Sequence, residues 1–407
     1  FMENNINKKY APRVKRTTEI ISLVACQVGL HACMQSMRLA TPLEALLMGY
    51  GELEVGILIS LFGLAPALLA IPAGHMADRY GYHSPVRIAA SLSMVAVVIT
   101  ALQGGLATLL LAASLSGAGS GFGMIAIQRT AGRMVSNSTD RIKIFSWIAL
   151  APAIAGFFGP GITGVLIDLY GFRVSFGSMA VFPIATFFLS WLVPAEKLNH
   201  SADNTKKYKP SKSLFTERLF IRLLIINWLV AVSWGVFSMA LPILSHERDI
   251  SSSVVGFIFM VYSLSSMVVR VIIPFVAQRL SEQIMLGGTL LLSAVVFMLF
   301  PIISSELTMA LLAAVLGIAL GMIQPAMLAM LYKITPKNRH GEALALRSAF
   351  SHISMATMPV MFGVLGSVVG IGALFWLMAI LLAAGSMQAR HLACLLYTSD
   401  AADDLPC

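Results

Sequence analysis

The stretch GILISLFGLAPALLAIPA, Gly56–Ala73, runs directly into GHMADRYGYH, Gly74–His83. The first part carries no charge, and about 20 apolar residues are what a helix needs to cross a lipid bilayer. The second part places Asp78 beside Arg79 immediately after that apolar run. The two parts together predict a membrane-spanning helix that ends in a charged turn at the membrane surface.

The whole chain shares the apolar character of this stretch. It has 407 residues, of which 57% are hydrophobic and 12% are charged, and its mean hydropathy is +0.83. Soluble globular proteins have roughly 25% charged residues. An outer-membrane barrel would show short segments of alternating hydrophobicity, and the apolar runs here do not alternate. The composition therefore predicts an all-α polytopic membrane protein.

The apolar runs predict about twelve transmembrane helices in two pseudo-symmetric halves of six. Residues 1–193 form the N-terminal half, 194–217 a polar linker and 218–393 the C-terminal half. Residues 394–407 include CLLYTSDAADD, which resembles a translated sequencing adapter, so we expect this tail to be non-native. The predicted spans are 20–46, 54–73, 86–103, 106–128, 141–167, 173–193, 218–244, 253–275, 284–302, 307–331, 342–369 and 371–391.

An internal repeat supports the division into halves. A shift of 200 residues aligns Gln27 with Asn227, and a shift of 199 aligns Gly171 with Gly370. Six helices per half return the chain to the same side of the membrane. The halves are therefore expected to be parallel repeats related by an axis along the membrane normal.

The distribution of basic residues predicts the orientation. All but four of the 28 Lys and Arg residues fall on the side of the termini and the linker 194–217. Arg173 and Arg248 fall on the other side, and Arg38 and Arg270 lie within spans. Because basic residues accumulate in cytoplasmic loops, we expect both termini to be cytoplasmic, in the inner membrane of a bacterium. The net charge of +9 thus orients the protein and does not indicate a nucleic-acid partner.

The charged turn resembles the loop between helices 2 and 3 of the major facilitator superfamily. The family pattern is Gly–x–(Leu)–Ala–Asp–Arg–x–Gly–(Arg/Lys)–(Arg/Lys). Tyr82 and His83 replace the usual basic pair, whereas five positions match: Gly74, Ala77, Asp78, Arg79 and Gly81. With twelve spans and a duplicated half, the resemblance covers nearly the whole chain. It implies the superfamily fold and secondary active transport of a small molecule.

The resemblance also implies a gate at the cytoplasmic rim. Asp78 would accept hydrogen bonds from the exposed amides at the start of helix 11, near Glu342, and complement its dipole. Arg129 and Arg133 are the candidates for a further, basic partner. Such a lock would hold the halves together in the outward-facing state and release them in the inward-facing state. The alternative is that Asp78 and Arg79 only solvate a loop.

Glycines have separate roles in this interpretation. Gly74 is expected to let helix 2 approach a neighbour closely, and Gly81 to supply the backbone freedom of a tight turn. A run of alternate glycines lies inside the fourth span, where close helix packing explains it better than nucleotide binding. These residues are Gly117, Gly119, Gly121 and Gly123.

A second motif, GFFGPGITG, occupies the fifth span. It resembles the antiporter signature Gly–x–x–x–Gly–Pro–x–x–Gly–Gly of exporters in this superfamily, and so implies export. Gly159, Pro160 and Gly164 match, whereas Ala155 and Thr163 stand at two other glycine positions. Small residues permit close helix packing, and Pro160 is expected to bend the helix. The alternative is a packing face without a transport role.

The first span carries the best candidate for substrate binding. Four polar residues spaced 4, 4 and 3 apart lie on one helical face: Gln27, His31, Gln35 and Arg38. A charged residue within a span usually faces a cavity. The repeat places Asn227 on the corresponding face of helix 7, with Trp234 as a possible aromatic wall. We expect a central substrate cavity; alternatively, Arg38 extends to the membrane surface and the glutamines only join helices.

Coupling to protons has two candidate groups. No Asp or Glu lies near the middle of a span, and Glu44 and Asp168 lie towards the outer ends. His31 is the candidate titrating group because imidazole ordinarily changes charge near neutral pH. An anion bound at Arg38 would favour proton uptake at His31, which suits symport. Export of cations would need an acid, and Glu44 is the nearest one.

Three functions remain open from the sequence. The first is a monomeric secondary exporter of small molecules, coupled to protons or another ion. The second is proton-coupled uptake of a small organic anion, and the third is a membrane sensor or scaffold that transports nothing. No enzyme, cofactor or metal site is indicated, because the histidines lack metal-ligand spacing and the chain has no Gly–x–x–x–x–Gly–Lys–Ser/Thr loop.

Overall fold

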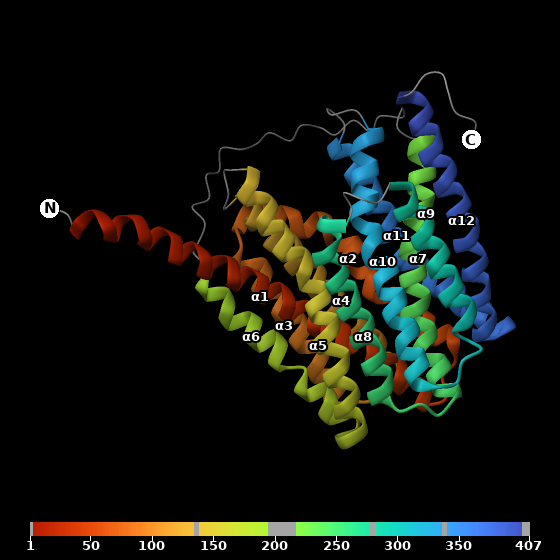
Figure 1. The fold of residues 1–407 in the computed structure, drawn as a ribbon. Helices are drawn as coiled ribbons and strands as arrows, with labels where there is room; N and C mark the ends of the chain where they lie inside the picture. Colours follow the sequence, from red (N-terminus) through yellow and green to blue (C-terminus); the bar gives the residue numbers. More distant parts are fainter. Residues whose placement is uncertain (1–2, 134–137, 194–216, 277–281, 336–339, 401–407) are drawn as a thin grey trace. The chain divides into compact units, whose positions relative to one another are not determined.

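The computed structural model describes residues 3–133, 138–193, 217–276, 282–335 and 340–400, which are almost entirely helical (Figure 1). The all-α prediction is confirmed for this part of the chain. The helices are α1 Glu3–Leu47, α2 Glu52–Tyr80, α3 His83–Leu102, α4 Leu106–Arg133, α5 Ser138–Ser178, α6 Val181–Leu189, the short 3-10 helix η1 Ser190–Leu192, α7 Arg218–Glu247, α8 Ser252–Val276, α9 Glu282–Leu299, α10 Glu306–Ile334, α11 His340–Val369 and α12 Ile371–Asp400.

The described helices account for the twelve predicted spans. Ten segments are long and apolar enough to cross a membrane, and Met285–Leu299 is a shorter apolar helix. One of the ten, Leu150–Leu192, has 43 residues and overlaps the two crossings predicted at 141–167 and 173–193. Gly171 separates these two crossings, because its torsions of φ 80° and ψ 173° break the helical path of α5. Helix α1 begins at Glu3, well before the predicted span, which starts at 20.

The chain divides into two compact units. Residues 1–41 and 65–204 form the first unit, and residues 42–64 and 205–407 form the second. The predicted halves differ from these units at 42–64, which was expected in the N-terminal half. This segment packs mainly with the second unit and is therefore described with it.

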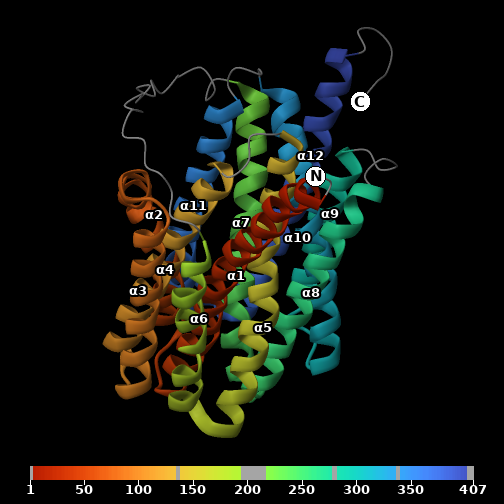
Figure 2. The same cartoon turned by 90° about the vertical axis from the view of Figure 1, so that its left-hand side faces the viewer.

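In the first unit, α3 packs along α4 and also contacts α5 and α6 (Figure 2). The alternate glycines of α4 make close packing possible, as the sequence predicted. A Cβ on Gly119 would lie 2.7 Å from the Ala89 carbonyl oxygen of α3, and a Cβ on Gly121 would lie 2.6 Å from the Pro66 Cβ of α2. A Cβ on Gly123 would overlap Leu30 of α1.

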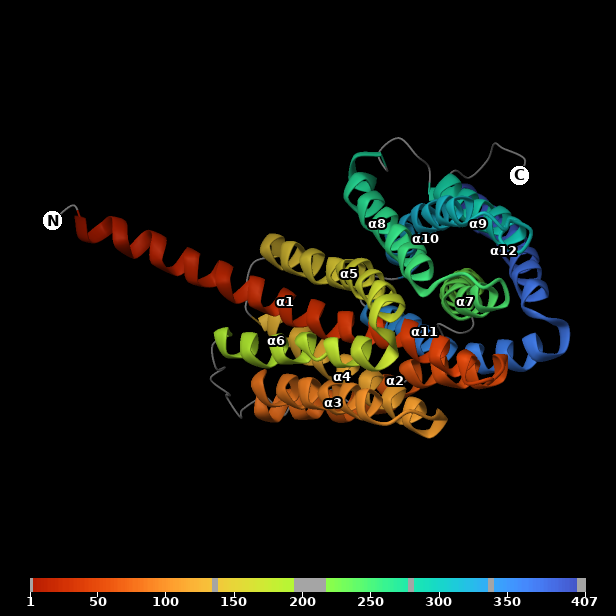
Figure 3. The same cartoon turned by 90° about the horizontal axis from the view of Figure 1, so that it is seen from below.

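In the second unit, α10 packs along α8 and α9, while α12 packs along α9 and α7 (Figure 3). Glycines again mark a close crossing, because a Cβ on Gly317 of α10 would overlap the Tyr262 carbonyl oxygen of α8, and one on Gly321 would lie 3.0 Å from the Ser266 carbonyl oxygen. Hydrogen bonds from side chains to backbone carbonyls join α12 to α9. Trp376 Nε1 donates to the Met298 carbonyl at 3.3 Å, and Ser386 Oγ donates to the Gly287 carbonyl at 2.8 Å.

The predicted repeat is visible in the backbone torsions. Gly171 and Gly370, aligned by the 199-residue shift, both have φ 80°. Gly49 has φ 86°, and Asp249, 200 residues later, has φ 54°. These left-handed torsions are rare for residues other than glycine. Equivalent connections in the two halves therefore turn in the same way.

Candidate functional site

An ion pair joins the charged turn to α4. Arg129 Nε donates to Asp78 Oδ1 at 2.6 Å, which is the geometry of a charge-assisted hydrogen bond. The Asp78 side chain is 66% exposed, whereas that of Arg129 is 13% exposed. Of the two predicted basic partners, Arg129 is the one seen in contact. The side chains of Arg133 and Glu342 lie outside the described residues.

The turn between α2 and α3 depends on Gly81. Its φ of 72° is the left-handed conformation that the tight turn requires, and its N–H donates to the Ala77 carbonyl at 3.0 Å. A Cβ on Gly74 would meet no heavy atom of the described residues within 4 Å, and the close approach expected there stays a prediction. Gly74 lies inside α2 on a half-exposed side. Arg79 is exposed, with its guanidinium 5.4 Å from the centre of the Tyr80 ring.

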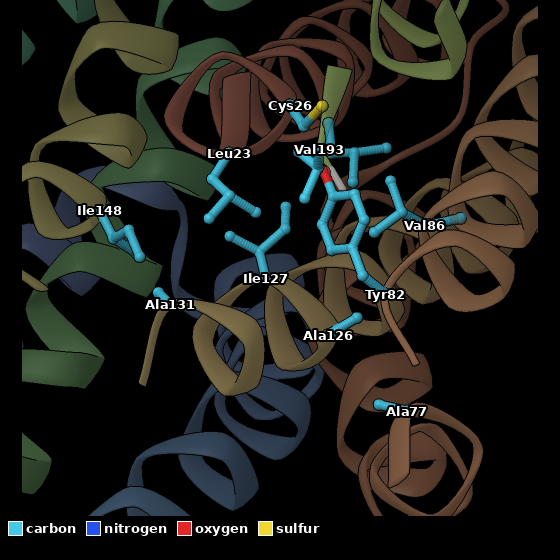
Figure 4. Close-up of a cluster of buried hydrophobic side chains, with 12 residues drawn as sticks. Leu23, Cys26, Ala77, Tyr82, Val86, Ala126, Ile127, Ala131, Ile148 and Val193 are labelled. Atoms are coloured by element: carbon cyan, nitrogen blue, oxygen red, sulfur yellow. The ribbon is translucent and has the colours of Figure 1, made fainter. Parts of the chain in front are cut away.

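Tyr82, which replaces a basic residue of the family pattern, is only 1% exposed. It belongs to a cluster of buried side chains that includes Cys26, Val86 and Ile127 (Figure 4). These residues come from α1, α3 and α4, so the ring anchors the turn against three helices. A cation at this position would be buried among apolar groups. The departure from the family pattern is therefore a packing adaptation.

The glycine–proline motif of α5 lies against α1. A Cβ on Gly159 would lie 2.9 Å from the Ala32 carbonyl oxygen and 3.0 Å from Ser36 Oγ. Pro160 and Gly164 are buried as well, and α5 remains helical through the proline. The motif thus brings the α5 backbone into direct contact with the helix that carries the polar stripe.

The polar stripe of α1 is largely buried within the first unit. Gln27, His31 and Arg38 are buried, and Gln35 is partly buried. Gln27 Nε2 lies 2.9 Å from His31 Nδ1, and the Ser120 hydroxyl of α4 lies 3.4 Å from the same nitrogen. Arg38 is 6% exposed, which argues against its extension to the membrane surface.

A second polar cluster, in the second unit, joins three helices. Arg347 Nη1 of α11 donates to Asn227 Oδ1 of α7 at 3.1 Å and to Gln324 Oε1 of α10 at 3.5 Å. Asn227 Nδ2 donates to Ser351 Oγ at 2.8 Å, and Ser351 Oγ donates to the Arg347 carbonyl at 3.0 Å. The sequence indicated Asn227 but missed the others, because Arg347 was counted among the basic residues at the start of helix 11. The signal that could have revealed them is the four-residue spacing of Arg347 and Ser351, which places both residues on the face of α11 towards α7.

The remaining predicted site residues have different surroundings. Trp234 stacks on Tyr262 of α8, with ring centres 4.9 Å apart and planes 25° apart, so it belongs to an aromatic cluster between α7 and α8. Glu44 is partly buried near the end of α1, and Asp168 is exposed. Among the described residues, no three His, Cys, Asp or Glu side chains are grouped closely enough to hold a metal ion.

Comparison with known proteins identifies the fold and its relatives. A model of the Major Facilitator Superfamily matches residues 24–231 and 223–404. The multi-drug resistance efflux pump PmrA of Streptococcus pneumoniae is 25% identical over 350 residues, covering 81% of this chain and 84% of that protein. The quinolone resistance protein NorA of Staphylococcus aureus is 22% identical over 326 residues, covering 77% and 80%. An uncharacterized MFS-type transporter of Methanocaldococcus jannaschii is 22% identical over 344 residues, covering 82% and 87%.

Solved structures share the same fold. A crystal structure of the peptide transporter POT matches with a TM-score of 0.75 and 14% sequence identity, covering 93% of this chain and 94% of that one. A POT family transporter in complex with 5-aminolevulinic acid matches with a TM-score of 0.72 and 14% identity. At this level of identity the likeness concerns the fold alone.

Proposed function

This chain belongs to the Major Facilitator Superfamily, and on that premise we propose that it is a proton-coupled exporter of small amphipathic molecules. The family and its relatives are membrane transporters, which are not enzymes, and the chain is a multi-pass inner-membrane protein. The proposal adds the direction of transport, the coupling ion, cytoplasmic termini and a monomeric state. It assigns no cofactor and no nucleic-acid partner.

The crossing of α5 over α1 at Gly159 is the observation that carries the direction of transport. The matching part of the exporter signature, Gly159–Pro160, forms this crossing, and a Cβ on Gly159 would lie 2.9 Å from the α1 backbone. Small residues at helix interfaces let backbones approach closely in lipid. The signature therefore acts on the helix that bears His31 and Arg38. The names of two relatives, an efflux pump and a quinolone resistance protein, support the same direction.

His31 and Gln27 together can hold or release a proton. In the neutral state, Nδ1 accepts a hydrogen bond from the Gln27 amide nitrogen at 2.9 Å. The other end of that amide, Gln27 Oε1, is buried and has no hydrogen-bond partner. Rotation of the amide by half a turn would present Oε1 to a protonated Nδ1, since an amide has a donor end and an acceptor end. The pair can therefore satisfy both protonation states of the imidazole.

Proton flux in proteoliposomes tests direction and coupling together. The vesicles enclose a pH-sensitive dye, and the membrane potential is clamped with potassium and valinomycin. One of three naphthalene probes is then added to the outside. The probes are a sulfonate, a neutral alcohol and a quaternary ammonium, none of which carries protons passively. Inward flow of a transported probe raises the internal pH for an antiporter and lowers it for a symporter. We expect a rise that is absent from protein-free vesicles.

Two variants locate the coupling group. His31→Gln should abolish the probe-driven pH change, because the amide cannot take up a proton, whereas Glu44→Gln should leave it intact. The opposite pattern would mean that the outer carboxylate carries the coupling. Binding of a probe without any flux of probe or protons would favour the sensor or scaffold.

Uptake of an organic anion is the second candidate. The observation that favours it is the buried guanidinium of Arg38, seven residues beyond His31 on α1. An anion at Arg38 and a proton at His31 would attract each other and so bind together. A fall in internal pH on addition of the sulfonate would establish this function and overturn export.

A further inference from the structure

Arg347 is partly buried and lies about two turns from the start of α11. It is the eighth residue of α11, Asn227 is the tenth residue of α7, and Gln324 precedes the end of α10 by ten residues. With a rise of about 1.5 Å per residue, all three lie roughly 10–15 Å from the proposed cytoplasmic ends of their helices. The hydrocarbon core of a bilayer is about 30 Å thick. The cluster is therefore within reach of a substrate site near the middle of the membrane.

The contacts of Arg347 orient its charge without neutralising it. Both acceptors of its Nη1 are amide oxygens, on Asn227 and Gln324, and neither carries a charge. Within the described ranges, the one ion pair is Arg129–Asp78, in the other unit. A second donor of Arg347, its Nε–H, is buried and has no hydrogen-bond partner. A cation in a membrane interior is ordinarily paired or faces a cavity.

Asn227 is fixed in the orientation that serves Arg347. Its amide nitrogen donates to Ser351 Oγ at 2.8 Å, so its oxygen faces the guanidinium. Ser351 is fixed in turn by its own hydrogen bond to the Arg347 carbonyl at 3.0 Å. The side chains of α7 and α11 thus hold the guanidinium in one direction while its Nε–H remains available. Guanidinium groups recognise planar or tetrahedral oxyanions through such paired donors.

We infer that Arg347, Asn227 and Gln324 form an anion subsite that binds a carboxylate, sulfonate or phosphonate group of the transported molecule. The incoming oxyanion accepts a hydrogen bond from the Nε–H of Arg347. It also supplies a negative counter-charge, which the two amides lack. This inference rests on the proposed transport function only in assuming a small-molecule substrate. It holds for either direction of transport. It assigns an anionic or zwitterionic substrate to the chain.

Calorimetric titration of the full chain in detergent tests the subsite with the same naphthalene sulfonate, alcohol and quaternary ammonium. We expect the sulfonate to bind at least tenfold more tightly than the other two. Arg347→Gln should weaken sulfonate binding at least tenfold, equivalent to about 1.4 kcal/mol. Arg222→Gln should change sulfonate binding less than twofold. This control removes a cation near the start of α7, the helix that carries Asn227, at a position away from the cluster.

Asn227→Asp is the decisive variant because it keeps the size of the side chain. It places a carboxylate where the amide oxygen now lies, 3.1 Å from Arg347 Nη1, and this internal counter-charge should exclude the sulfonate. A purely structural cluster would instead be strengthened by the ion pair, with sulfonate binding unchanged. Preference of the parent for the quaternary ammonium, absence of sulfonate binding, or equal binding by Asn227→Asp would each overturn the subsite.

The two proposals fail separately. Sulfonate binding that depends on Arg347, in a protein that moves neither probe nor protons, would end the transport proposal and leave the subsite standing. Proton-coupled flux of the quaternary ammonium alone would support export and end the subsite.

Discussion

Asp78 and Tyr82 belong to one turn but differ sharply in their surroundings. The carboxylate of Asp78 is mostly exposed and pairs with Arg129, whereas the ring of Tyr82 is buried among α1, α3 and α4. An exposed ion pair contributes about 0–1 kcal/mol to stability, and a buried ring contributes much more. Stability and the proposed gating role are therefore divided between neighbouring residues.

Asp78→Asn should reduce transport at least tenfold while lowering the free energy of unfolding by less than about 1 kcal/mol. The reason is that the amide is a weaker acceptor than the carboxylate, both for Arg129 and for a helix end. Initial rates of probe flux, normalised to protein in the vesicles, measure the effect. Glu306→Gln, at an exposed acid that begins α10, is the control. Undiminished transport by Asp78→Asn would reduce this residue to a solvated loop position.

Tyr82→Phe should change the free energy of unfolding by no more than about 1 kcal/mol. The Tyr82 hydroxyl is buried and its hydrogen-bond partner is the Cys26 thiol, which is a weak partner because sulfur is a poor donor and acceptor. Tyr82→Arg, which restores the usual family residue, should destabilise the fold because the cation would be buried. Thermal unfolding in detergent compares the three proteins. Greater stability of the arginine variant would contradict the packing role.

At the scale of helices, glycine positions in α4 decide how closely the first unit packs. The sequence predicted this correctly, because alternate glycines inside a long apolar run have few other uses. The same reasoning stays a prediction at Gly74, where a Cβ would meet no heavy atom of the described residues within 4 Å. A sequence shows that a residue is small, but only packing shows whether a neighbour occupies the space.

Gly119→Ala and Gly74→Ala should change stability in opposite directions. The new methyl at position 119 would lie 2.5 Å from Ser93 Oγ and 2.7 Å from the Ala89 carbonyl. Such overpacking typically costs about 1–3 kcal/mol. At position 74 the methyl has open space, and replacing a helical glycine by alanine gains about 0.5–1 kcal/mol. Equal melting temperatures for the two variants would show that α4 can move away from α3.

At the scale of the whole molecule, the number of helices and the repeat followed from the sequence because each span is a local signal. Apolar length defines a crossing, and Gly171 and Gly370 mark equivalent connections. The cluster of Arg347, Asn227 and Gln324 did not follow, because its members come from three helices and meet only after packing. An arginine near a helix start has the same sequence signal whether it faces water or the interior.

The orientation of the chain is a further prediction at this scale. A single cysteine at Asn204, in the linker, and one at Ser252, at the start of α8, should react with a membrane-impermeant maleimide from opposite sides. The expected result in intact cells is labelling at Ser252 only, because the basic residues place the linker in the cytoplasm. Both single-cysteine variants are made in a chain whose native cysteines have been replaced. Labelling after permeabilisation of the cells is the control that each site is accessible to the maleimide. Labelling of both sites in intact cells would reverse or invalidate the orientation.

The shared φ of 80° at Gly171 and Gly370 has a meaning for ancestry. A tandem gene duplication leaves two copies that must each preserve the same chain reversal, while the chemistry of each copy is free to diverge. Gln278 stands where the first copy has Asp78, and Ile148 stands where the second copy has Arg347. The acidic rim residue is thus present in one copy only, and the partly buried arginine in the other only. A duplicated chain can in this way keep one backbone turn in both halves while each half carries its own polar chemistry.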